Sequence, residues 1–157
     1  METPSGLGIR QAAAADAEQL LALVRAYWEF EALPGYDRRA VLRQLRRMLA
    51  APAHAAAWLA ADDEGPLGYL LAVYVYSLEH LGLTAEIDEL YVLPRARGAG
   101  VGGRLLAAAE AEFIARGCTN VSLQLGRDNE AARAFYGRRG YGPRAGFELL
   151  DKMLPGA

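Results

Sequence analysis

The chain has 157 residues, 53% of them hydrophobic and 23% charged, which is typical of one soluble globular domain with a substantial core. Its 17 basic and 19 acidic residues nearly cancel, so the charge pattern that binds nucleic acid or a membrane surface is missing. The single cysteine, Cys118, cannot form an internal disulfide, and with two histidines it offers no metal-binding spacing. We therefore expect a single domain over residues 1–157, with no metal and no nucleic-acid partner.

The first 20 residues lack the basic segment and the following apolar run of a secretory signal peptide. No uninterrupted apolar stretch reaches the ~18 residues that a membrane-spanning helix needs. Together with the lone cysteine, these features predict a cytoplasmic protein with no membrane partner.

The N-terminal third is predicted to contain one strand and two helices. Residues 7–11 are expected to form the strand, and Asp16 with Gln19 three residues later is typical of a capping box at the start of a helix. The stretch "LPGYD" ends this helix. Asp37 can cap a second helix, whose apolar stripe extends to Leu49.

The middle of the chain is predicted to form three consecutive strands. "AAAWLAADDEGPLGYLLAVYVYSLEH" contains two strands around the turn "DDEGP", and residues 67–78 are apolar in both phases, which is typical of a central strand. "TAEIDELYVL" is the third strand. Strict alternation places Glu86, Asp88, Leu90 and Val92 on one of its faces and Glu89 on the other.

The C-terminal part is predicted to alternate helices and strands. A glycine-rich junction leads into a helix that ends at Gly117, and "CTNVSLQL" follows as a strand. "NEAARAFYGRRG" is then a short helix and "GFELLDKML" a last strand. The resulting order, β-α-α-β-β-β-α-β-α-β, indicates a single mixed α/β domain.

The junction places Gly98, Gly100, Gly102 and Gly103 within six positions. A glycine in a helix costs about 1 kcal/mol relative to alanine, so this density requires a local reason. A tight turn needs only one or two of these glycines. A dinucleotide-binding fingerprint, G-x-G-x-x-G, is matched, but it also requires an early βαβ unit and an acidic residue at the end of the next strand, and "NVSLQLG" contains no acid.

A third interpretation of the junction is an anion-binding helix start. The first N–H groups of a helix have no intrahelical partner and carry about half a positive charge. Glycines let an anion approach these groups closely, and Arg95, Arg97 and Arg104 add positive charge nearby. The expected ligand is a pyrophosphate lying across the loop.

Three sequence elements resemble those of the N-acetyltransferases of the GNAT family. "RGAGVG" matches the R-x-x-G-x-G signature, with Arg97, Gly100 and Gly102 in the signature positions. "IDELYVLP" looks like the family's fourth strand, and "NEAARAFYGRRGYG" is similar to its N-x-x-A-x-x-F-Y-x-x-x-G-F/Y element. Their order and spacing also fit. The resemblance covers essentially the whole chain and is strongest over residues 85–142.

The resemblance implies a mixed, splayed β-sheet flanked by helices, with acetyl-CoA bound beside the fourth strand. The pyrophosphate would rest on backbone amides of the loop, and the pantetheine arm would pair with the fourth strand like an added strand. Two side chains near the last helix would close over the arm. The implied CoA-binding residues are Leu90, Tyr91, Val92, Arg97, Gly98, Ala99, Gly100, Val101, Gly102, Gly103, Asn129 and Tyr136.

The implied reaction is direct attack of a primary amine on the thioester. The family's base commonly sits at the positions of Glu86 and Asp88, and Glu89, expected on the opposite face, ranks below both. Tyr136 resembles the general acid that protonates the leaving thiolate. The competing interpretations are a salt bridge at the end of the sheet for the carboxylates and a packed aromatic residue for Tyr136.

Aromatic and acidic side chains of the first two helices and of the strands near Tyr76 and His80 are expected to select a cationic acceptor, although most are equally good core or loop residues. These candidates are Tyr27, Trp28, Glu31, Tyr76 and His80. The expected partner is an amine of a small molecule or of a peptide or protein, and a homodimer is a further option. The alternative function is a non-catalytic CoA-binding sensor.

Overall fold

The structure is a computed structural model that describes residues 4–156. The chain separates into two compact units, with the boundary between Gln124 and Leu125. The prediction of one domain over residues 1–157 stays a prediction. Among the described residues, no helix is both long enough and apolar enough to cross a bilayer.

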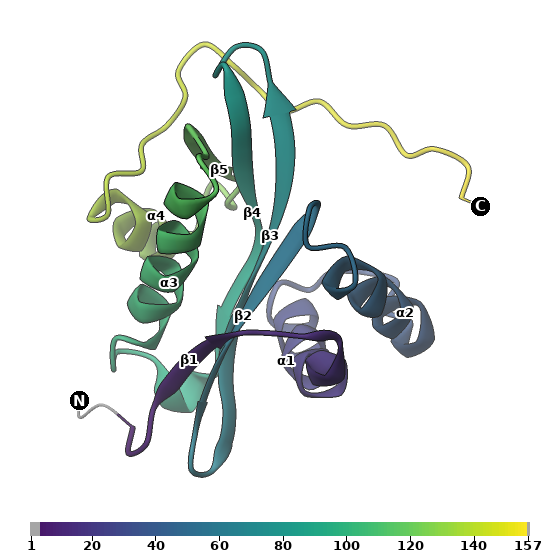
Figure 1. Cartoon of the computed structure of the whole chain (residues 1–157), viewed down its shortest axis with the longest axis vertical. Helices are drawn as coiled ribbons and strands as arrows, with labels where there is room; N and C mark the ends of the chain where they lie inside the picture. Colours follow the sequence, from purple (N-terminus) through teal and green to yellow (C-terminus); the bar gives the residue numbers. More distant parts are fainter. Residues whose placement is uncertain (1–3, 157) are drawn as a thin grey trace. The chain divides into compact units, whose positions relative to one another are not determined.

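The first unit is built on a five-stranded mixed sheet (Figure 1). The strands lie in the order β1 (Gly8–Gln11), β2 (Ala55–Asp62), β3 (Gly65–Ser77), β4 (Gly82–Val92) and β5 (Asn120–Leu123). Neighbours among the first four strands are antiparallel, and β5 runs parallel to β4. Helices α1 (Ala17–Phe30) and α2 (Arg38–Leu49) lie on one face of the sheet and α3 (Val101–Ala115) on the other (Figure 1). The predicted mixed sheet flanked by helices is confirmed.

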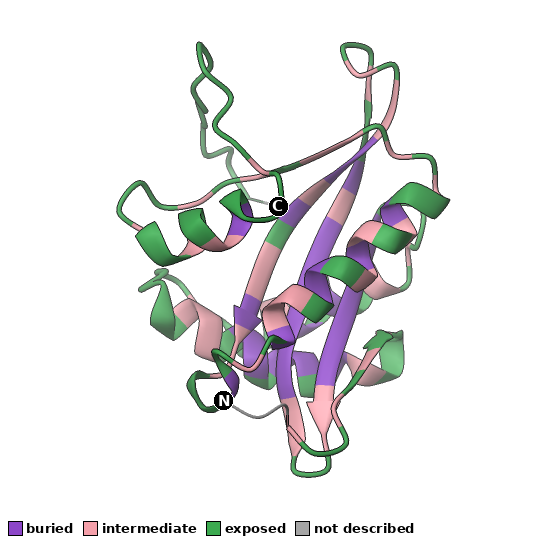
Figure 2. Cartoon of the chain, turned by 90° about the vertical axis from the view of Figure 1, so that its left-hand side faces the viewer, coloured by how far each residue is buried: buried purple, intermediate pink, exposed green. Residues whose placement is uncertain are grey.

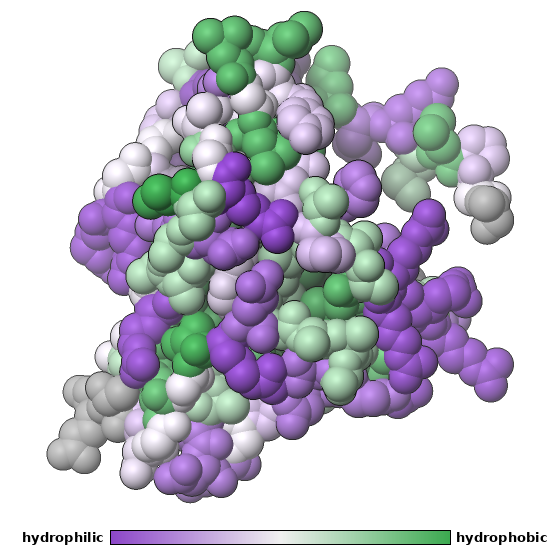
Figure 3. Space-filling view, in the orientation of Figure 1, coloured by the Kyte–Doolittle hydropathy of each residue, from purple (hydrophilic) through white to green (hydrophobic). Residues whose placement is uncertain are grey.

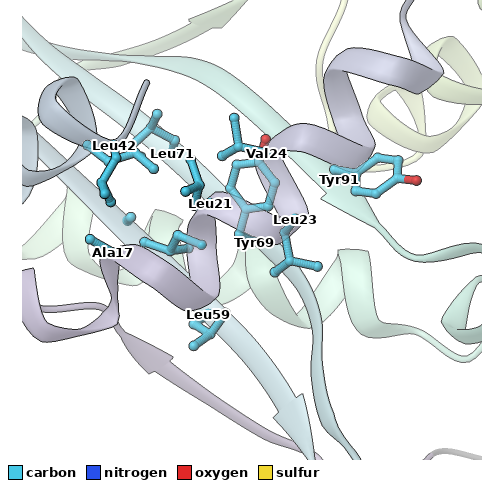
Figure 4. Packing of buried hydrophobic residues seen from close by; sticks show 12 residues of the cluster. Ala17, Leu21, Leu23, Val24, Leu42, Leu59, Tyr69, Leu71 and Tyr91 are labelled. Carbon is cyan, nitrogen blue, oxygen red and sulfur yellow. The ribbon is translucent and has the colours of Figure 1, made fainter. Parts of the chain in front are cut away.

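The core of this unit consists of apolar layers on both faces of the sheet, and the central strands are buried along most of their length (Figure 2). On the first face, Leu21 and Val24 of α1 belong to one buried cluster with Tyr69 of β3 (Figure 4). On the other face, the Phe113 ring of α3 meets the Trp58 ring edge to face, with 5.6 Å between centroids. Each such side chain, fully buried, contributes about 1.5–3 kcal/mol relative to exposure.

The end of the β3–β4 hairpin is apolar but exposed. Burial on both faces of β3 extends only to Tyr74, whereas Tyr76, Leu78 and Leu81 are 87%, 93% and 87% exposed. The apolar surface is visible at this end of the hairpin in Figure 3. The expectation that residues 67–78 are buried on both faces is therefore wrong beyond Tyr74, because the helices that cover the sheet do not extend over the hairpin end.

The second unit contains helix α4 (Glu130–Gly137), with Asn129 as its N-cap. The Asn129 side chain accepts a hydrogen bond from the backbone N–H of Ala132, at 3.1 Å. The predicted last strand, "GFELLDKML", is wrong, since residues 146–154 form no strand. Phe147 and Leu150 in this segment are exposed. Alternating apolar residues favour a strand, but a strand also needs a ladder partner, and this segment has none among the described residues.

The predicted caps of the first two helices have different outcomes. Asp37 caps α2 as expected, because its carboxylate accepts from the Ala40 N–H at 2.8 Å. The capping box of Asp16 with Gln19 is wrong. A short 3₁₀ turn, η1 (Ala14–Asp16), precedes α1, and the Asp16 carboxylate closes this turn on the Ala13 N–H.

The Asp16 carboxylate also receives two hydrogen bonds from the Arg10 guanidinium, at 2.6 and 2.8 Å, which tie α1 to β1. The Arg10 hydrogen bonds, together with that from Ala13, lower the pKa of Asp16 to about 2. A carboxylate with a lowered pKa stabilises the fold above its unfolded-state pKa, and this contribution is lost as the pH falls through the folded pKa.

We expect Asp16→Asn to reduce the free energy of unfolding at pH 7 by about 1–2 kcal/mol, since Arg10 is largely exposed and solvent screens the pair. The difference from wild type should shrink as the pH falls from 4 towards 2. Urea unfolding at several pH values measures it. Glu29→Gln, which removes an exposed ion pair with Arg25, is the control and should change stability by less than about 0.5 kcal/mol. A loss that is independent of pH would contradict this assignment.

Candidate active site

Strand β4 contains a β-bulge in the middle of its pairing with β3. Leu71 lies opposite Glu89 and Ala72 lies opposite Ile87, so Asp88 is an extra residue with no partner of its own. The extra residue shifts the alternation of side chains along β4. Glu86, opposite Val73, therefore shares the face of Glu89. The expected separation of these two glutamates onto opposite faces is wrong, because alternation in a sequence does not reveal a bulge.

Glu89 is half-buried on the face of the sheet that α1 covers. The Tyr69 hydroxyl donates a hydrogen bond to Glu89 Oε1 at 2.9 Å, and the Trp28 indole N–H reaches the same carboxylate. Loss of water raises the pKa of Glu89 to about 7, the Tyr69 and Trp28 hydrogen bonds oppose this rise, and the charge of Asp88 adds to it. Burial is also the main reason that the pKa of Tyr69 is raised, so its hydroxyl remains a donor at neutral pH. The result is a carboxylate that titrates near neutrality.

The two other carboxylates of β4 lie beside Glu89. Asp88 is exposed by surface area, yet the protein atoms packed around its carboxylate desolvate it and raise its pKa, with the charge of Glu86 as the second cause. Glu86 is half-buried, and its Oε1 accepts a long hydrogen bond of 3.5 Å from the Gln124 side-chain amide. Three carboxylates thus gather around the bulge, and the pKa shifts of Asp88 and Glu89 show that two of them are desolvated.

The C-terminal half of β4 has one free edge within the first unit. Its parallel pairing with β5 ends at Ile87 and Leu123, while the pairing with β3 on the other edge continues to Val92. Residues Leu90, Tyr91 and Val92 therefore have no strand beside their second edge among residues 4–124. The Tyr91 side chain is buried against α1, so it is the backbone of this stretch that can pair with a ligand.

The glycine junction forms the start of α3. Gly98 and Gly100 have φ values of +78° and +82°, a conformation that glycine adopts without strain, and Gly100 is the N-cap of the helix. Ala99 lies between them, and Val101 begins the helix with its side chain in the core. Within residues 4–156, the N–H groups of residues 98–103 donate no hydrogen bond of good geometry. Such a run of free N–H groups at a helix start is suited to an anion.

The three arginines near this junction contact protein groups. Arg97 donates from Nε to the Val92 carbonyl at 2.9 Å, and its guanidinium lies over the Phe30 ring, 4.8 Å from the centroid. Arg95 is 3.4 Å from Glu64, and Arg104 reaches the Leu7 carbonyl at 3.5 Å. Arg97 therefore ties the loop to the end of β4 and to α1. Arg97 and Arg104 contact carbonyl groups and not carboxylates, so their charges add to that of the loop N–H groups.

In the second unit, Tyr136 is buried and its pKa is raised to about 12 by burial. Its ring packs edge to face with those of Phe135 and Tyr141, with centroids 5.0 and 5.4 Å apart. A raised phenol pKa keeps the hydroxyl protonated at neutral pH. Tyr136 can therefore act as a hydrogen-bond or proton donor.

The structure brings some of the predicted acceptor-binding residues together and separates others. Trp28 reaches Glu89, and the Tyr27 ring meets the Tyr91 ring with 6.0 Å between centroids, whereas Glu31 is exposed just after α1. Tyr76 lies five residues beyond Leu71 along β3, which is about 17 Å at the usual rise of a strand. His80 lies beyond it, in the hairpin turn.

Sequence reasoning did not single out Tyr69, the hydrogen-bond partner of Glu89, and it ranked Glu89 below Glu86 and Asp88. A buried tyrosine usually has a partner for its hydroxyl, so a tyrosine within the apolar run "LGYLLAVY" was a usable signal. No comparable signal marked the bulge. Among residues 4–156, no group of three acidic, histidine or cysteine side chains is arranged to hold a metal ion.

Comparisons with known proteins agree with this geometry. The sequence pattern of the acetyltransferase (GNAT) family matches residues 17–141. The chain is 31% identical over 144 residues to the "Uncharacterized N-acetyltransferase YhfO" of Bacillus subtilis, covering 90% of this chain and 93% of that protein. It is 39% identical over 66 residues to an aminoalkylphosphonate N-acetyltransferase of Salmonella typhimurium, covering 42% of this chain and 43% of that protein.

Solved structures share the fold. The aminoglycoside N-acetyltransferase AAC(6')-Iy in complex with CoA superposes with a TM-score of 0.82 at 21% identity, over 98% of this chain and 99% of that chain. A probable acetyltransferase gives a TM-score of 0.83 at 22% identity, over 96% and 99%. At these identities the likeness establishes the architecture.

Proposed function

This chain belongs to the acetyltransferase (GNAT) family and is an N-acetyltransferase, and we propose that it moves an acetyl group from acetyl-CoA directly to a primary amine. The main support for acetyl-CoA as the acetyl donor is the run of free N–H groups at residues 98–103, together with the free edge of β4. The first feature suits a pyrophosphate and the second suits the amide groups of a pantetheine arm. CoA contains both chemical groups.

The proposed CoA site comprises the backbone of Leu90, Tyr91 and Val92 and the loop from Arg97 to Gly103. Asn129 and Tyr136 are proposed to contact CoA on the family resemblance alone. The loop amides would hold the pyrophosphate by hydrogen bonds and by the positive end of α3. The arm would extend along β4 as an added strand. This arrangement fixes the thioester relative to the carboxylates of β4, which is a positioning contribution to the rate.

The β4 carboxylates and Tyr136 would supply the proton transfers. A lysine-like amine has a pKa near 10.4, so neutralising it at pH 7 costs about 4.6 kcal/mol. Glu86 and Asp88, the positions that the family resemblance favours, would attract the ammonium form of the acceptor. Tyr136 would donate to the thiolate that leaves when the new C–N bond forms and the C–S bond breaks.

The acceptor is proposed to be a cationic amine of a small molecule or of a peptide. Three carboxylates and the aromatic residues Trp28 and Tyr27 provide charge and stacking surfaces for a cation. Relatives whose names state aminoglycoside or aminoalkylphosphonate acetylation support the small-molecule option. The test is release of free CoA from acetyl-CoA, measured over a panel of amines and peptides.

We expect Gly100→Asp to weaken CoA binding by at least tenfold, because a carboxylate at the helix start repels the pyrophosphate. Isothermal titration with CoA measures the affinity. Gly117→Asp is the matched control: Gly117 has φ +77°, lies just beyond the other end of α3, and like Gly100 has no atom within 4 Å of an added Cβ. Both variants should lose similar stability, and only Gly100→Asp should lose affinity. Unchanged affinity in folded Gly100→Asp would remove the proposed phosphate site.

We expect Tyr136→Phe to lower kcat by about ten- to a thousand-fold with little change in CoA affinity or thermal stability, since only the donor hydroxyl is removed. The rate must be measured where chemistry limits turnover. Tyr74→Phe is the control, because the buried Tyr74 hydroxyl has no hydrogen-bond partner among the described residues and its loss should be neutral. An undiminished kcat in Tyr136→Phe would leave Tyr136 as a packing residue.

A further inference from the structure

We propose that Glu89, held by Tyr69 and Trp28 at the bulge of β4, is the residue that accepts the proton of the bound ammonium group, while Glu86 and Asp88 attract that cation. The inference rests on the proposed function and assigns a role that sequence reasoning had given to Glu86 and Asp88. Its basis is the geometry of the bulge, which turns Glu89 onto the same face as Glu86.

The Glu89 carboxylate is held by hydrogen bonds from Tyr69 and Trp28. The Tyr69 hydroxyl is bonded to Oε1 at 2.9 Å, and Tyr69 itself is 1% exposed, so it cannot move without disturbing the core. Trp28 reaches the carboxylate from α1. A carboxylate can accept about four hydrogen bonds, so capacity remains for a substrate ammonium. Glu89 is therefore oriented before any substrate arrives, as a base must be.

The surroundings of Glu89 contain more negative than positive charge. Asp88 and Glu86 face the site from β4, Tyr69 from β3, and Tyr27 from α1. The Arg97 guanidinium lies over the Phe30 and Tyr91 rings, 4.8 and 5.3 Å from their centroids, and is not among the groups that shift the pKa of Glu89. No described ion pair neutralises Glu89. The pKa of Glu89, raised to about 7 mainly by burial, agrees with this setting.

The position of Glu89 also suits the proposed donor. Glu89 directly precedes Leu90, Tyr91 and Val92, the stretch whose free edge would pair with the pantetheine arm. In the step assigned to Glu89, one N–H bond of R–NH₃⁺ breaks and a carboxyl O–H bond forms, giving R–NH₂ and neutral Glu89. The amine lone pair then forms the C–N bond to the acetyl carbon and the C–S bond breaks. The nitrogen loses a second proton as the neutral amide forms, which balances the proton that the leaving thiolate takes up to give CoA–SH. Glu89 later returns its own proton to water.

The kinetic test compares conservative variants over pH 5.5–9 with the best amine of the panel. Glu89→Gln should lower kcat/KM by about 10²–10⁴-fold at pH 7 and remove the rise in rate that wild type shows as Glu89 loses its proton near pH 7. Glu89→Asp should recover part of the rate. Glu86→Gln and Asp88→Asn should mainly raise KM for the amine, and both should keep the rise in kcat/KM near pH 7. Glu29→Gln, exposed on α1, is the control for an unspecific loss of charge.

A second measurement tests whether the Glu89 carboxyl titrates near neutrality in the folded protein, as a base working at pH 7 requires, and it needs no activity. A carboxyl whose folded pKa is raised binds more protons folded than unfolded, so its contribution to stability falls as the pH rises from about 4.5 to 7. The Glu89→Gln variant has no such carboxyl and should not show this loss of stability. The unfolding midpoint of the variant minus that of wild type should therefore increase from pH 4.5 to pH 8.

Two results would overturn the role of Glu89. One is a Glu89→Gln enzyme whose kcat/KM at pH 7 lies within threefold of the wild-type value and still rises with pH near pH 7. The other is a stability difference between Glu89→Gln and wild type that does not change with pH. If wild type acetylates no amine, the proposed function fails, and the stability measurement alone then decides whether Glu89 is a proton acceptor poised at neutral pH.

Discussion

The extra residue that β4 carries at Asp88 determines which side chains meet at the candidate site. Without it, Glu86 and Glu89 would lie on opposite faces of the sheet, and only one of them could share the face of the Tyr69 hydroxyl, which is buried under α1. An unsatisfied buried hydroxyl costs about 1–3 kcal/mol, so the Tyr69–Glu89 hydrogen bond stabilises the register that contains the bulge. Burial of Glu89 opposes folding at neutral pH, because removing water disfavours its charged form. The bulge therefore couples the packing of α1 on the sheet to the presence of a carboxylate that titrates near neutrality.

In the loop before α3, the backbone and the side chains have different roles. Two glycines with positive φ turn the chain so that successive N–H groups point away from the protein's own acceptors. Arg97 holds this turn in place through the Val92 carbonyl and the Phe30 ring, so its main contacts are internal. A guanidinium in such a position stabilises the loop whether or not an anion is bound. The signature arginine and the signature glycines thus have different physical roles, the first in positioning the loop and the second in exposing its amides.

The sequence predicted the parts of this protein that depend on local pattern. The order of elements through α4, the Asp37 cap, the hairpin turn "DDEGP" and the glycine junction all follow from periodicity, capping and turn chemistry. Features that depend on a partner elsewhere in the chain were missed. Asp16 was assigned to the wrong turn because Arg10, six residues earlier, binds its carboxylate, and residues 146–154 have the composition of a strand without a ladder partner. The bulge at Asp88 also depends on a partner, because an extra residue in β4 relative to β3 cannot be recognised from the sequence of either strand alone. Strict alternation therefore placed Glu89 on the face opposite Glu86 and ranked it below Glu86 and Asp88.

The raised pKa of Glu89 has a definite energetic meaning for proton transfer. Moving a proton from a lysine-like ammonium of pKa near 10.4 to an ordinary glutamate of pKa near 4.3 is uphill by about 8.3 kcal/mol. With a pKa of about 7, Glu89 reduces this difference to about 4.6 kcal/mol. An ammonium bound beside it would lower the pKa of Glu89, but the same desolvation that raises the carboxyl pKa also lowers that of the amine, so the two values approach each other as water leaves. Glu86 and Asp88 have the opposite effect on the amine, because negative charge stabilises the ammonium. Attraction of the cation and removal of its proton therefore make conflicting demands on one carboxylate, and a site with three of them can divide these demands between residues.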